Sequence, residues 1–237
     1  MHFRDRMVIL TGVGREGQVG EVVAGTFADH GARMILIDRT PAHVEARAAA
    51  LRGAGHDVRS YACDLTDEAE TGVVAGKIAT TCGGRVDALV HLAGGFAFSG
   101  RVDESDVAVW HRQLAINLTT AYVVTRAFLP LLRPSRGAIV YFASAAALPG
   151  ADTTGMVAYV TAKAGVLALM RTVAREERAT GVRANALAPT AIRTAANIES
   201  MGEETVHYIE REQVAETVMF LCSEEARAIS GQVVGMG

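Results

Sequence analysis

The chain has 237 residues and a formal net charge of −3, with 23 Lys and Arg against 26 Asp and Glu. Half of its residues are hydrophobic and 21% are charged, a composition typical of globular proteins with a well-buried core. This balance provides no basic surface for nucleic acid or for an anionic membrane, so we expect neither as a partner.

No segment predicts export, a membrane span or a metal centre. The apolar run at residues 7–10 is too short for a signal-peptide core, and no uninterrupted run approaches the roughly 20 residues that a spanning helix needs. Cys63, Cys82 and Cys222 form no C-x-x-C pair, which favours free thiols. The seven histidines lack metal-ligand spacing. We expect a soluble, cytoplasmic protein without a metal.

Short apolar runs alternate with longer, Ala-rich amphipathic stretches along the chain. The runs predict strands at residues 7–10, 33–38, 58–63, 88–93, 138–143, 182–188 and 232–235. The stretches predict helices at residues 19–30, 42–53, 68–82, 107–132, 157–180 and 212–223. Strands this continuously apolar are typical of a parallel sheet covered on both faces. We therefore predict one α/β domain over residues 1–237, a doubly wound (Rossmann) sheet of about seven strands that binds ligands at the carboxyl ends of its strands.

The first predicted strand runs into TGVGREGQVG, which contains the string G-x-G-x-x-G. Such a loop can bring backbone N–H groups and a helix N-terminus to a nucleotide pyrophosphate. The string alone is weak evidence, but here a strand precedes it and a helix follows it. The candidate cofactor contacts in this loop are Gly12, Gly14, Gly17, Gln18 and Val19.

Asp38 ends the second predicted strand, 21 positions after Gly17. A carboxylate here accepts hydrogen bonds from the adenosine ribose hydroxyls and repels a 2′-phosphate, which favours NAD. The guanidinium groups of Arg39 and Arg15 can hold a 2′-phosphate, so NADP stays an alternative.

Two further strand ends carry candidate cofactor contacts. Asp64 and Leu65 follow the third strand, where a carboxylate can accept from the adenine amino group. Ala93 and Gly94 follow the fourth strand, where small residues let the cofactor pass close to the backbone. At both places the residues are equally consistent with ordinary strand ends that have no role in cofactor binding.

Tyr159 and Lys163 lie four positions apart in the fifth predicted helix, so the phenol and the ammonium share one helix face. A nearby cation stabilises the phenolate and lowers the tyrosine pKa towards the working range of a general acid/base. Ser144, at the end of the fifth strand, can donate to the same substrate oxygen. All three fall beside the predicted nucleotide crevice.

These residues together resemble the short-chain dehydrogenase/reductase superfamily over essentially the whole chain. The matching pieces follow in order: Thr11-Gly12, Asp64-Leu65, Ala93-Gly94, Asn117, Ser144, Tyr159 with Lys163, Asn185 to Pro189, and Thr194. Each piece is common alone, whereas the ordered set is specific.

The resemblance implies hydride transfer between nicotinamide C4 and a secondary alcohol or ketone. Tyr159 would be the acid/base, Lys163 would bind the nicotinamide ribose and lower the tyrosine pKa, and Ser144 would bond the substrate oxygen. Asn117 would anchor a water in a proton relay. Further cofactor contacts are implied at Pro189, Thr190, Ile192 and Thr194. The helices at 107–132 and 157–180 would form the contacts of a homodimer or homotetramer.

The sequence departs from the family pattern at several places. The common Asn-Asn before Ala93 is His91-Leu92, and we expect His91 to be a hydrogen-bonded structural residue. Ser144 precedes Tyr159 by 15 positions rather than the usual 13, which implies a longer loop around residues 152–155. These departures indicate a divergent member whose substrate cannot be taken from a typical one.

The glycine loop also departs from the usual spacing. Counting back from Asp38 places Gly20 at the close-packing position of the first helix, in a loop two residues longer than usual. Gln18 then stands at the position of the usual middle glycine and would face the phosphates. The G-x-G-x-x-G frame is therefore interpreted as coincidental.

Two other functions stay open on the same fold. The glycine spacing resembles that of enoyl-acyl-carrier-protein reductases, and AGG with GM-x-x-Y faintly resembles dihydropteridine reductase, so C=C or C=N reduction is an alternative. A four-residue Tyr–Lys spacing argues against the enoyl type. A non-catalytic nucleotide sensor is the other alternative, against which the intact proton-handling residues argue. Phe96, Phe98 and Met156 are candidates to line a substrate pocket.

Overall fold

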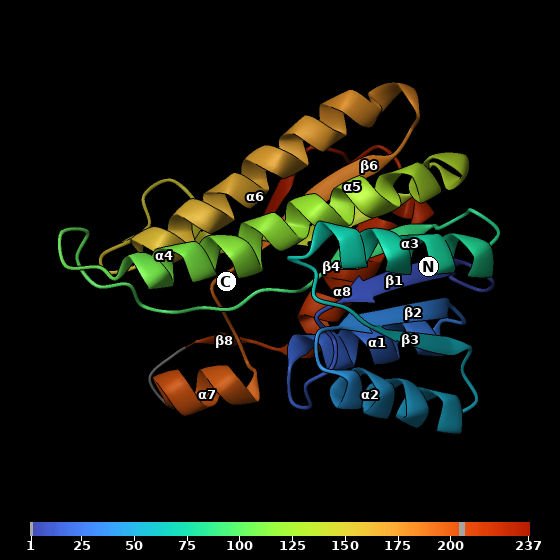
Figure 1. The fold of residues 1–237 in the computed structure, drawn as a ribbon, viewed down its shortest axis with the longest axis horizontal. Coiled ribbons are helices and arrows are strands. Elements are labelled where there is room, and N and C mark those ends of the chain that lie inside the picture. The colour runs from blue at the N-terminus through green and yellow to red at the C-terminus, as the bar shows by residue number, and fades with distance from the viewer. Residues whose placement is uncertain (1, 204–206) are drawn as a thin grey trace.

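The computed structural model describes residues 2–203 and 207–237, and its centre is one parallel sheet (Figure 1). Seven strands pair in the order β3-β2-β1-β4-β5-β6-β9. Their bounds are β1 Met7–Thr11, β2 Arg33–Asp38, β3 Val58–Ala62, β4 Ala88–His91, β5 Ala138–Phe142, β6 Arg183–Pro189 and β9 Val233–Met236. The order reverses between β1 and β4, and this switch point is where doubly wound sheets bind their ligands.

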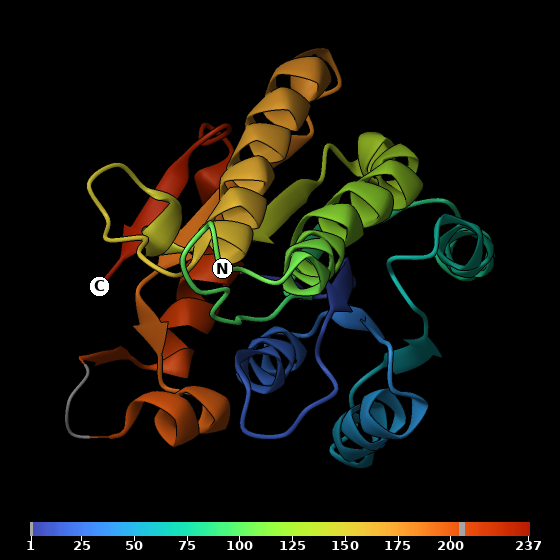
Figure 2. The same cartoon turned by 60° about the vertical axis from the view of Figure 1, so that its left-hand side comes forward.

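Helices cover both faces of the sheet (Figure 2). One face carries α1 Val19–Asp29, α2 Pro41–Gly53 and α8 Arg211–Cys222. The other carries α3 Glu68–Thr81, α5 Thr120–Leu132 and α6 Val157–Glu176. Along β1, Val8 and Leu10 pack towards α1 while Ile9 packs towards α5, and all three side chains are fully buried. Burial on both faces explains why the strands are continuously apolar.

The predicted fold is confirmed, and the strand and helix bounds differ from the prediction mainly at the ends. One predicted helix is divided in the structure. Residues 107–132 form α4 Val107–Leu114, then a π-helical turn, Ala115–Thr119, and then α5. The predicted helix 157–180 ends earlier as an α-helix, and a 3-10 turn, Glu177–Ala179, completes it.

The segment between β6 and α8 has structure that the sequence did not predict. It forms β7 Ala191–Ile192, α7 Ala195–Met201 and β8 Tyr208–Ile209, and β7 pairs with β8 as a small parallel sheet. These elements are too short for hydrophobic periodicity to reveal them.

Two helical stretches, Val107–Ser135 and α6, are long and apolar enough to cross a membrane by length and composition alone. Both cover the sheet, and Phe128 and Met170 on their inner faces are completely buried. Core packing accounts for part of this apolar character, because 39% of the apolar window in each stretch is buried.

Candidate active site

The glycine turn after β1 lies against the end of β4. Gly12 has a φ of 75°, which favours glycine, and a Cβ atom on it would lie 2.6 Å from the backbone of Ala93. Only glycine permits this approach. The predicted contacts Gly12, Ala93 and Gly94 are therefore brought together at the switch point of the sheet.

The start of α1 is suited to hold a pyrophosphate. A Cβ atom on Gly20 would lie 2.8 Å from the Cα of Val13, which confirms Gly20 as the close-packing glycine. Gln18 is extended and provides no side-chain cap for α1. The first N–H groups of the helix, beginning at Val19, are thus without a capping side chain, and the positive end of the helix dipole favours an anion here.

Gly14 and Gly17 fix the shape of the loop. The Gly14 N–H donates to Asp38 Oδ2 at 2.9 Å, and the Gly17 N–H donates to Glu21 Oε2 at 2.8 Å. The Gly17 carbonyl accepts from the N–H of Ala195 at 3.0 Å, so the loop also contacts α7. Sequence reasoning missed Glu21, whose carboxylate is neutralised by Arg47 at 2.7 Å.

The acidic residues at the end of β2 and shortly after β3 have different surroundings. Besides Gly14, Asp38 accepts from the Thr40 N–H through its other oxygen at 3.1 Å, and each oxygen keeps a lone pair for a ribose hydroxyl. Hydrogen bonds from Thr66 lower the pKa of the Asp64 carboxyl, and the charge of Arg39 adds to this effect. Arg39 therefore lies near Asp64, and Leu65 beside it is buried.

Ser144, Tyr159 and Lys163 meet where β5 ends and α6 begins. Lys163 is buried, and its Nζ donates to the carbonyl of Phe142 at 2.8 Å. The same Nζ lies 5.8 Å from the centroid of the Tyr159 ring. Ser144 is also buried and hydrogen-bonds the Tyr159 side chain. The three groups predicted from sequence thus form one cluster.

The protonation of this cluster is set mainly by burial. Burial raises the pKa of the Tyr159 phenol, and the hydrogen bond with Ser144 opposes that shift. Burial also lowers the pKa of Lys163 to about 8. We expected Lys163 to lower the tyrosine pKa; in this structure burial is the main influence and raises it, because a buried phenolate loses its hydration.

Asn117 lies in the π-helical turn and holds the segment after β4. Its Oδ1 accepts from the Gly95 N–H at 3.1 Å, and its Nδ2 donates to the Gly95 carbonyl at 2.9 Å. A Cβ atom on Gly94 would lie 2.6 Å from Asn117 Oδ1 and 3.4 Å from Lys163 Nζ, so the three residues converge. Gln113, which sequence reasoning missed, accepts from Asn117 Nδ2 at 3.1 Å and keeps a buried Nε2 without a described partner.

The remaining predicted contacts lie along the segment that leaves β6. Pro189 ends β6, and the Thr190 N–H donates to the Met236 carbonyl at 2.9 Å. Ile192 lies in β7, and Thr194 caps α7 by accepting from the Asn197 N–H at 3.2 Å. This segment therefore faces the glycine loop through α7, as the contact between Ala195 and Gly17 shows.

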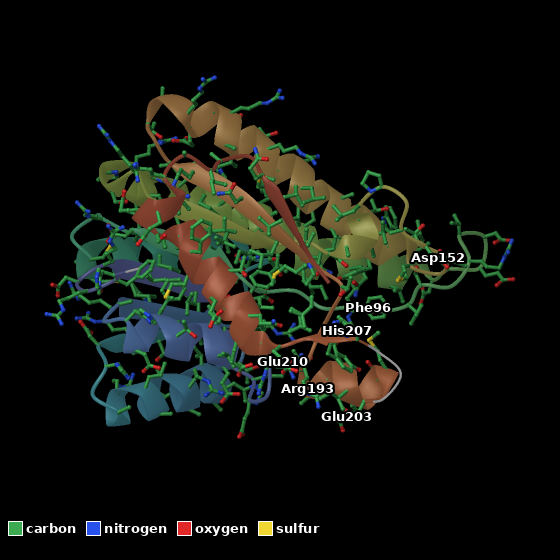
Figure 3. The ribbon with its side chains drawn as sticks, turned by 180° about the vertical axis from the view of Figure 1, so that it is seen from behind. Phe96, Asp152, Arg193, Glu203, His207 and Glu210 are labelled. Carbon is green, nitrogen blue, oxygen red and sulfur yellow. The ribbon has the colours of Figure 1, made fainter. Side chains whose placement is uncertain are left out.

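Phe96 lies at the same end of the molecule as α7, and Arg193, Glu203 and His207 lie there too (Figure 3).

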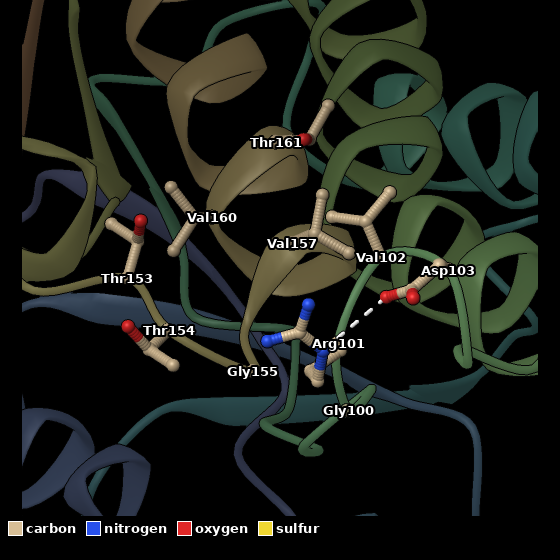
Figure 4. Close-up of a pocket in the computed structure, with 10 residues that line it drawn as sticks. All are labelled: Gly100, Arg101, Val102, Asp103, Thr153, Thr154, Gly155, Val157, Val160 and Thr161. Atoms are coloured by element: carbon tan, nitrogen blue, oxygen red, sulfur yellow. Dashed lines mark ion pairs between the residues drawn. The ribbon is translucent and has the colours of Figure 1, made fainter.

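A separate pocket of about 530 Å³ opens between residues 100–103 and the start of α6 (Figure 4). Its lining residues Val160 and Thr161 lie about 100° and 200° around α6 from Tyr159, at roughly 100° per residue. This pocket is thus turned away from the cluster of Ser144, Tyr159 and Lys163.

In the described part of the chain, no group of three or more His, Cys, Asp or Glu side chains could hold a metal ion. The three cysteines are free, and Cys63 and Cys222 are buried.

Comparison with known proteins matches this chain to dehydrogenases and reductases. A family model described as enoyl-(acyl carrier protein) reductase matches residues 12–236. The chain is 30% identical to 2-(S)-hydroxypropyl-CoM dehydrogenase 3 of Xanthobacter autotrophicus, over 96% of this chain and 93% of that one. It is 31% identical to D-threitol dehydrogenase of Mycolicibacterium smegmatis, over 92% and 86%. The solved structure of levodione reductase, 28% identical, superposes with a TM-score of 0.89 over 99% of this chain and 96% of that one.

Proposed function

Because this chain belongs to the short-chain dehydrogenase/reductase superfamily, we propose that it is an NAD-dependent enzyme that interconverts a secondary alcohol and a ketone. The observation that carries this proposal is the cluster of Ser144, Tyr159 and Lys163 at the end of β5. It combines a proton carrier, a donor for the substrate oxygen and a buried cation.

In the oxidative direction, the Tyr159 phenolate takes the hydroxyl proton while Ser144 donates a hydrogen bond to the same oxygen. NAD, when bound, supplies the hydride acceptor at nicotinamide C4. With a pKa of about 8, Lys163 is mostly an ammonium at neutral pH, and its charge stabilises the phenolate form of Tyr159 against the opposing effect of burial. Asn117 keeps the Gly95 backbone in place beside the cluster.

The role of Tyr159 is tested by the substitution Tyr159→Phe. We expect the variant to bind NADH nearly as wild type does, because the ring and its packing are retained. Its turnover of a secondary alcohol should fall by a factor of about 10³, the range for a lost general acid/base. Fluorescence titration with NADH and steady-state rates measure the two properties. Wild-type turnover by this variant would refute the mechanism.

The preference for NAD is supported by the place of Asp38 beside the glycine loop. Arg39 lies near Asp64 and provides the opposing argument for NADP. Assaying kcat/KM with both cofactors in parallel decides the question. We expect NAD to be favoured in wild type, and Asp38→Ser to reduce that preference, since it removes the charge that repels a 2′-phosphate.

The description of the matching family model favours C=C reduction as a second candidate. Tyr159 and Lys163 are four residues apart on α6, whereas the resemblance to enoyl-acyl-carrier-protein reductases implies a wider spacing, which argues against this candidate. Oxidation of NADH by crotonyl thioesters, measured beside ketone reduction, separates the two activities. Turnover of the thioester alone would favour the enoyl candidate.

A homodimer or homotetramer through α4, α5 and α6 is part of the proposal. The outer face of α6 exposes small side chains, Thr161, Ala164 and Ala168, and α5 exposes Tyr122. Small residues allow close helix packing between subunits. Light scattering after gel filtration measures the assembly, and a monomer would contradict it.

A further inference from the structure

Two exposed phenylalanines lie beside Tyr159, and we name Phe96 and Phe98 together the aromatic shelf. Their side chains are 50% and 69% exposed, whereas Phe27 and Phe128 are completely buried. The two rings meet edge to face with centroids 4.9 Å apart, and Phe96 meets Tyr159 in the same way at 5.0 Å. A continuous aromatic surface therefore runs from solvent to the phenol of the catalytic cluster.

The aromatic shelf is held in place by the loop that precedes α6. The Ser99 N–H donates to the Gly155 carbonyl at 2.9 Å, and the Ser99 hydroxyl donates to the same carbonyl at 3.2 Å. Gly100 pairs with Met156 as a parallel bridge. A Cβ atom on Gly155 would lie 3.6 Å from the Phe98 ring. The longer loop thus fixes the shelf before a ligand arrives, which lowers the entropic cost of binding.

Apolar residues adjoin Tyr159 on one side of the shelf. On the β5 side of Tyr159 the chain continues as Ala145–Ala147 and Leu148. The neighbouring charges, Arg101 and Asp103, pair with each other at 3.4 Å and line the pocket on the outer flank of α6 (Figure 4). A hydroxyl group buried against an aromatic ring without a hydrogen-bond partner is unfavourable, so a polyol fits poorly.

We propose that the aromatic shelf receives an apolar ring that the substrate carries next to its carbinol carbon. The substrate class is then a cyclic or aryl secondary alcohol, or the corresponding ketone, rather than a polyol. Aromatic side chains hold a ring by edge-to-face contacts that add to simple burial. This inference rests on the proposed function, because the ring must reach Tyr159.

Wild-type rates with NAD on three probe alcohols test the class. We expect kcat/KM for 1-phenylethanol to exceed that for 2-propanol by at least tenfold, and erythritol to be the poorest of the three. A preference for erythritol would overturn the inference and leave the proposed function intact.

Substitutions in the shelf test its role. Phe96→Ala should lower the ratio of kcat/KM for 1-phenylethanol to that for 2-propanol by about tenfold, and Phe98→Ala by about threefold. Phe96→Tyr, which keeps a ring, should restore most of the ratio. Phe220→Ala on α8 is the matched control and should change the ratio less than twofold. Unchanged ratios in both shelf variants would contradict the inference.

A binding measurement separates this inference from the proposed function. Acetophenone and acetone are titrated into the Tyr159→Phe protein loaded with NADH. The shelf predicts at least tenfold tighter binding of acetophenone, and loss of that advantage when Phe96→Ala is added. If Tyr159→Phe remains fully active, the proposed role of Tyr159 is wrong, but the comparison of acetophenone with acetone still tests whether the aromatic shelf binds a ring. Equal binding of both ketones would overturn the shelf alone.

Discussion

The imidazole of His91 links the two halves of the candidate site. It is buried at the end of β4, where its Nδ1 lies 2.9 Å from the Thr11 hydroxyl and its Nε2 lies 3.2 Å from the Thr120 hydroxyl. Thr120 donates its own proton to the Ile116 carbonyl, so it accepts from His91. His91 is therefore neutral and carries its proton on Nε2. Its two hydrogen bonds connect Thr11 at the end of β1 with Thr120, which directly follows the turn that carries Asn117. The expected structural role is confirmed.

This neutral state makes His91 sensitive to acid. Burial, with a smaller influence from Lys163, lowers the pKa of His91 from its ordinary value of 6.5 to about 3. At pH values between about 3 and 6.5, His91 is protonated in the unfolded chain and neutral in the folded chain. The free energy of unfolding therefore falls as pH falls from 6.5 towards 3, by about 1.4 kcal/mol per pH unit from this group. Above pH 6.5 the contribution is fully present.

Urea unfolding of wild type and His91→Gln at pH 4.5, 5.5 and 7.5 measures this dependence. The variant should be less stable at pH 7.5, and its stability should fall less steeply with acid. His207→Gln, at an exposed position, is the matched control and should keep the wild-type slope. Equal slopes in all three proteins would show that His91 is not the acid-sensitive group.

At the scale of elements, a buried guanidinium holds the end of α8. Arg183 on β6 donates to the carbonyls of Leu221 at 2.8 Å and Ser223 at 2.9 Å, and to that of Ile229 at 3.3 Å. The last carbonyls of a helix have no partner within it, so this side chain satisfies groups that burial would otherwise leave unpaired. Burial lowers the pKa of the guanidinium, which nonetheless stays charged.

Arg183→Met should therefore reduce the free energy of unfolding by about 3 kcal/mol, because buried carbonyls lose their donor. Chemical denaturation at one fixed protein concentration measures the loss. Arg178→Met, at an exposed position after α6, should change stability by less than about 0.5 kcal/mol. Similar losses in both variants would argue against the capping role.

Hydrophobic periodicity predicted the long elements well and the local irregularities not at all. The residues AINLT continue an apolar helical pattern, so the sequence predicted one helix where the structure has a π-helical turn at Ala115–Thr119. The structure adds a tertiary contact there: a Cβ atom on Gly165 of α6 would lie 2.7 Å from the Leu118 side chain, so α6 packs tightly on this turn. Such packing has no signature in a single sequence.

At the scale of the whole molecule, the sheet gathers residues from distant parts of the chain at one edge. The parallel order β1-β4-β5-β6 brings together Gly12, Gly94, Ser144 and Pro189 as successive strand ends. Sequence alone predicted these strand ends, because each motif follows an apolar run. It did not predict Gln113 or Glu21, which act through partners that only the folded chain brings near.

Transfer of a label tests the central proposal most directly. The enzyme is incubated with NAD and 1-phenylethanol that carries deuterium on the carbinol carbon, and the reduced cofactor is examined by mass spectrometry. Direct hydride transfer predicts one deuterium in the reduced nicotinamide with wild type, and at least a thousandfold slower labelling with Tyr159→Phe. Absence of deuterium from the cofactor during ketone formation, or equal labelling by the two proteins, would contradict the account.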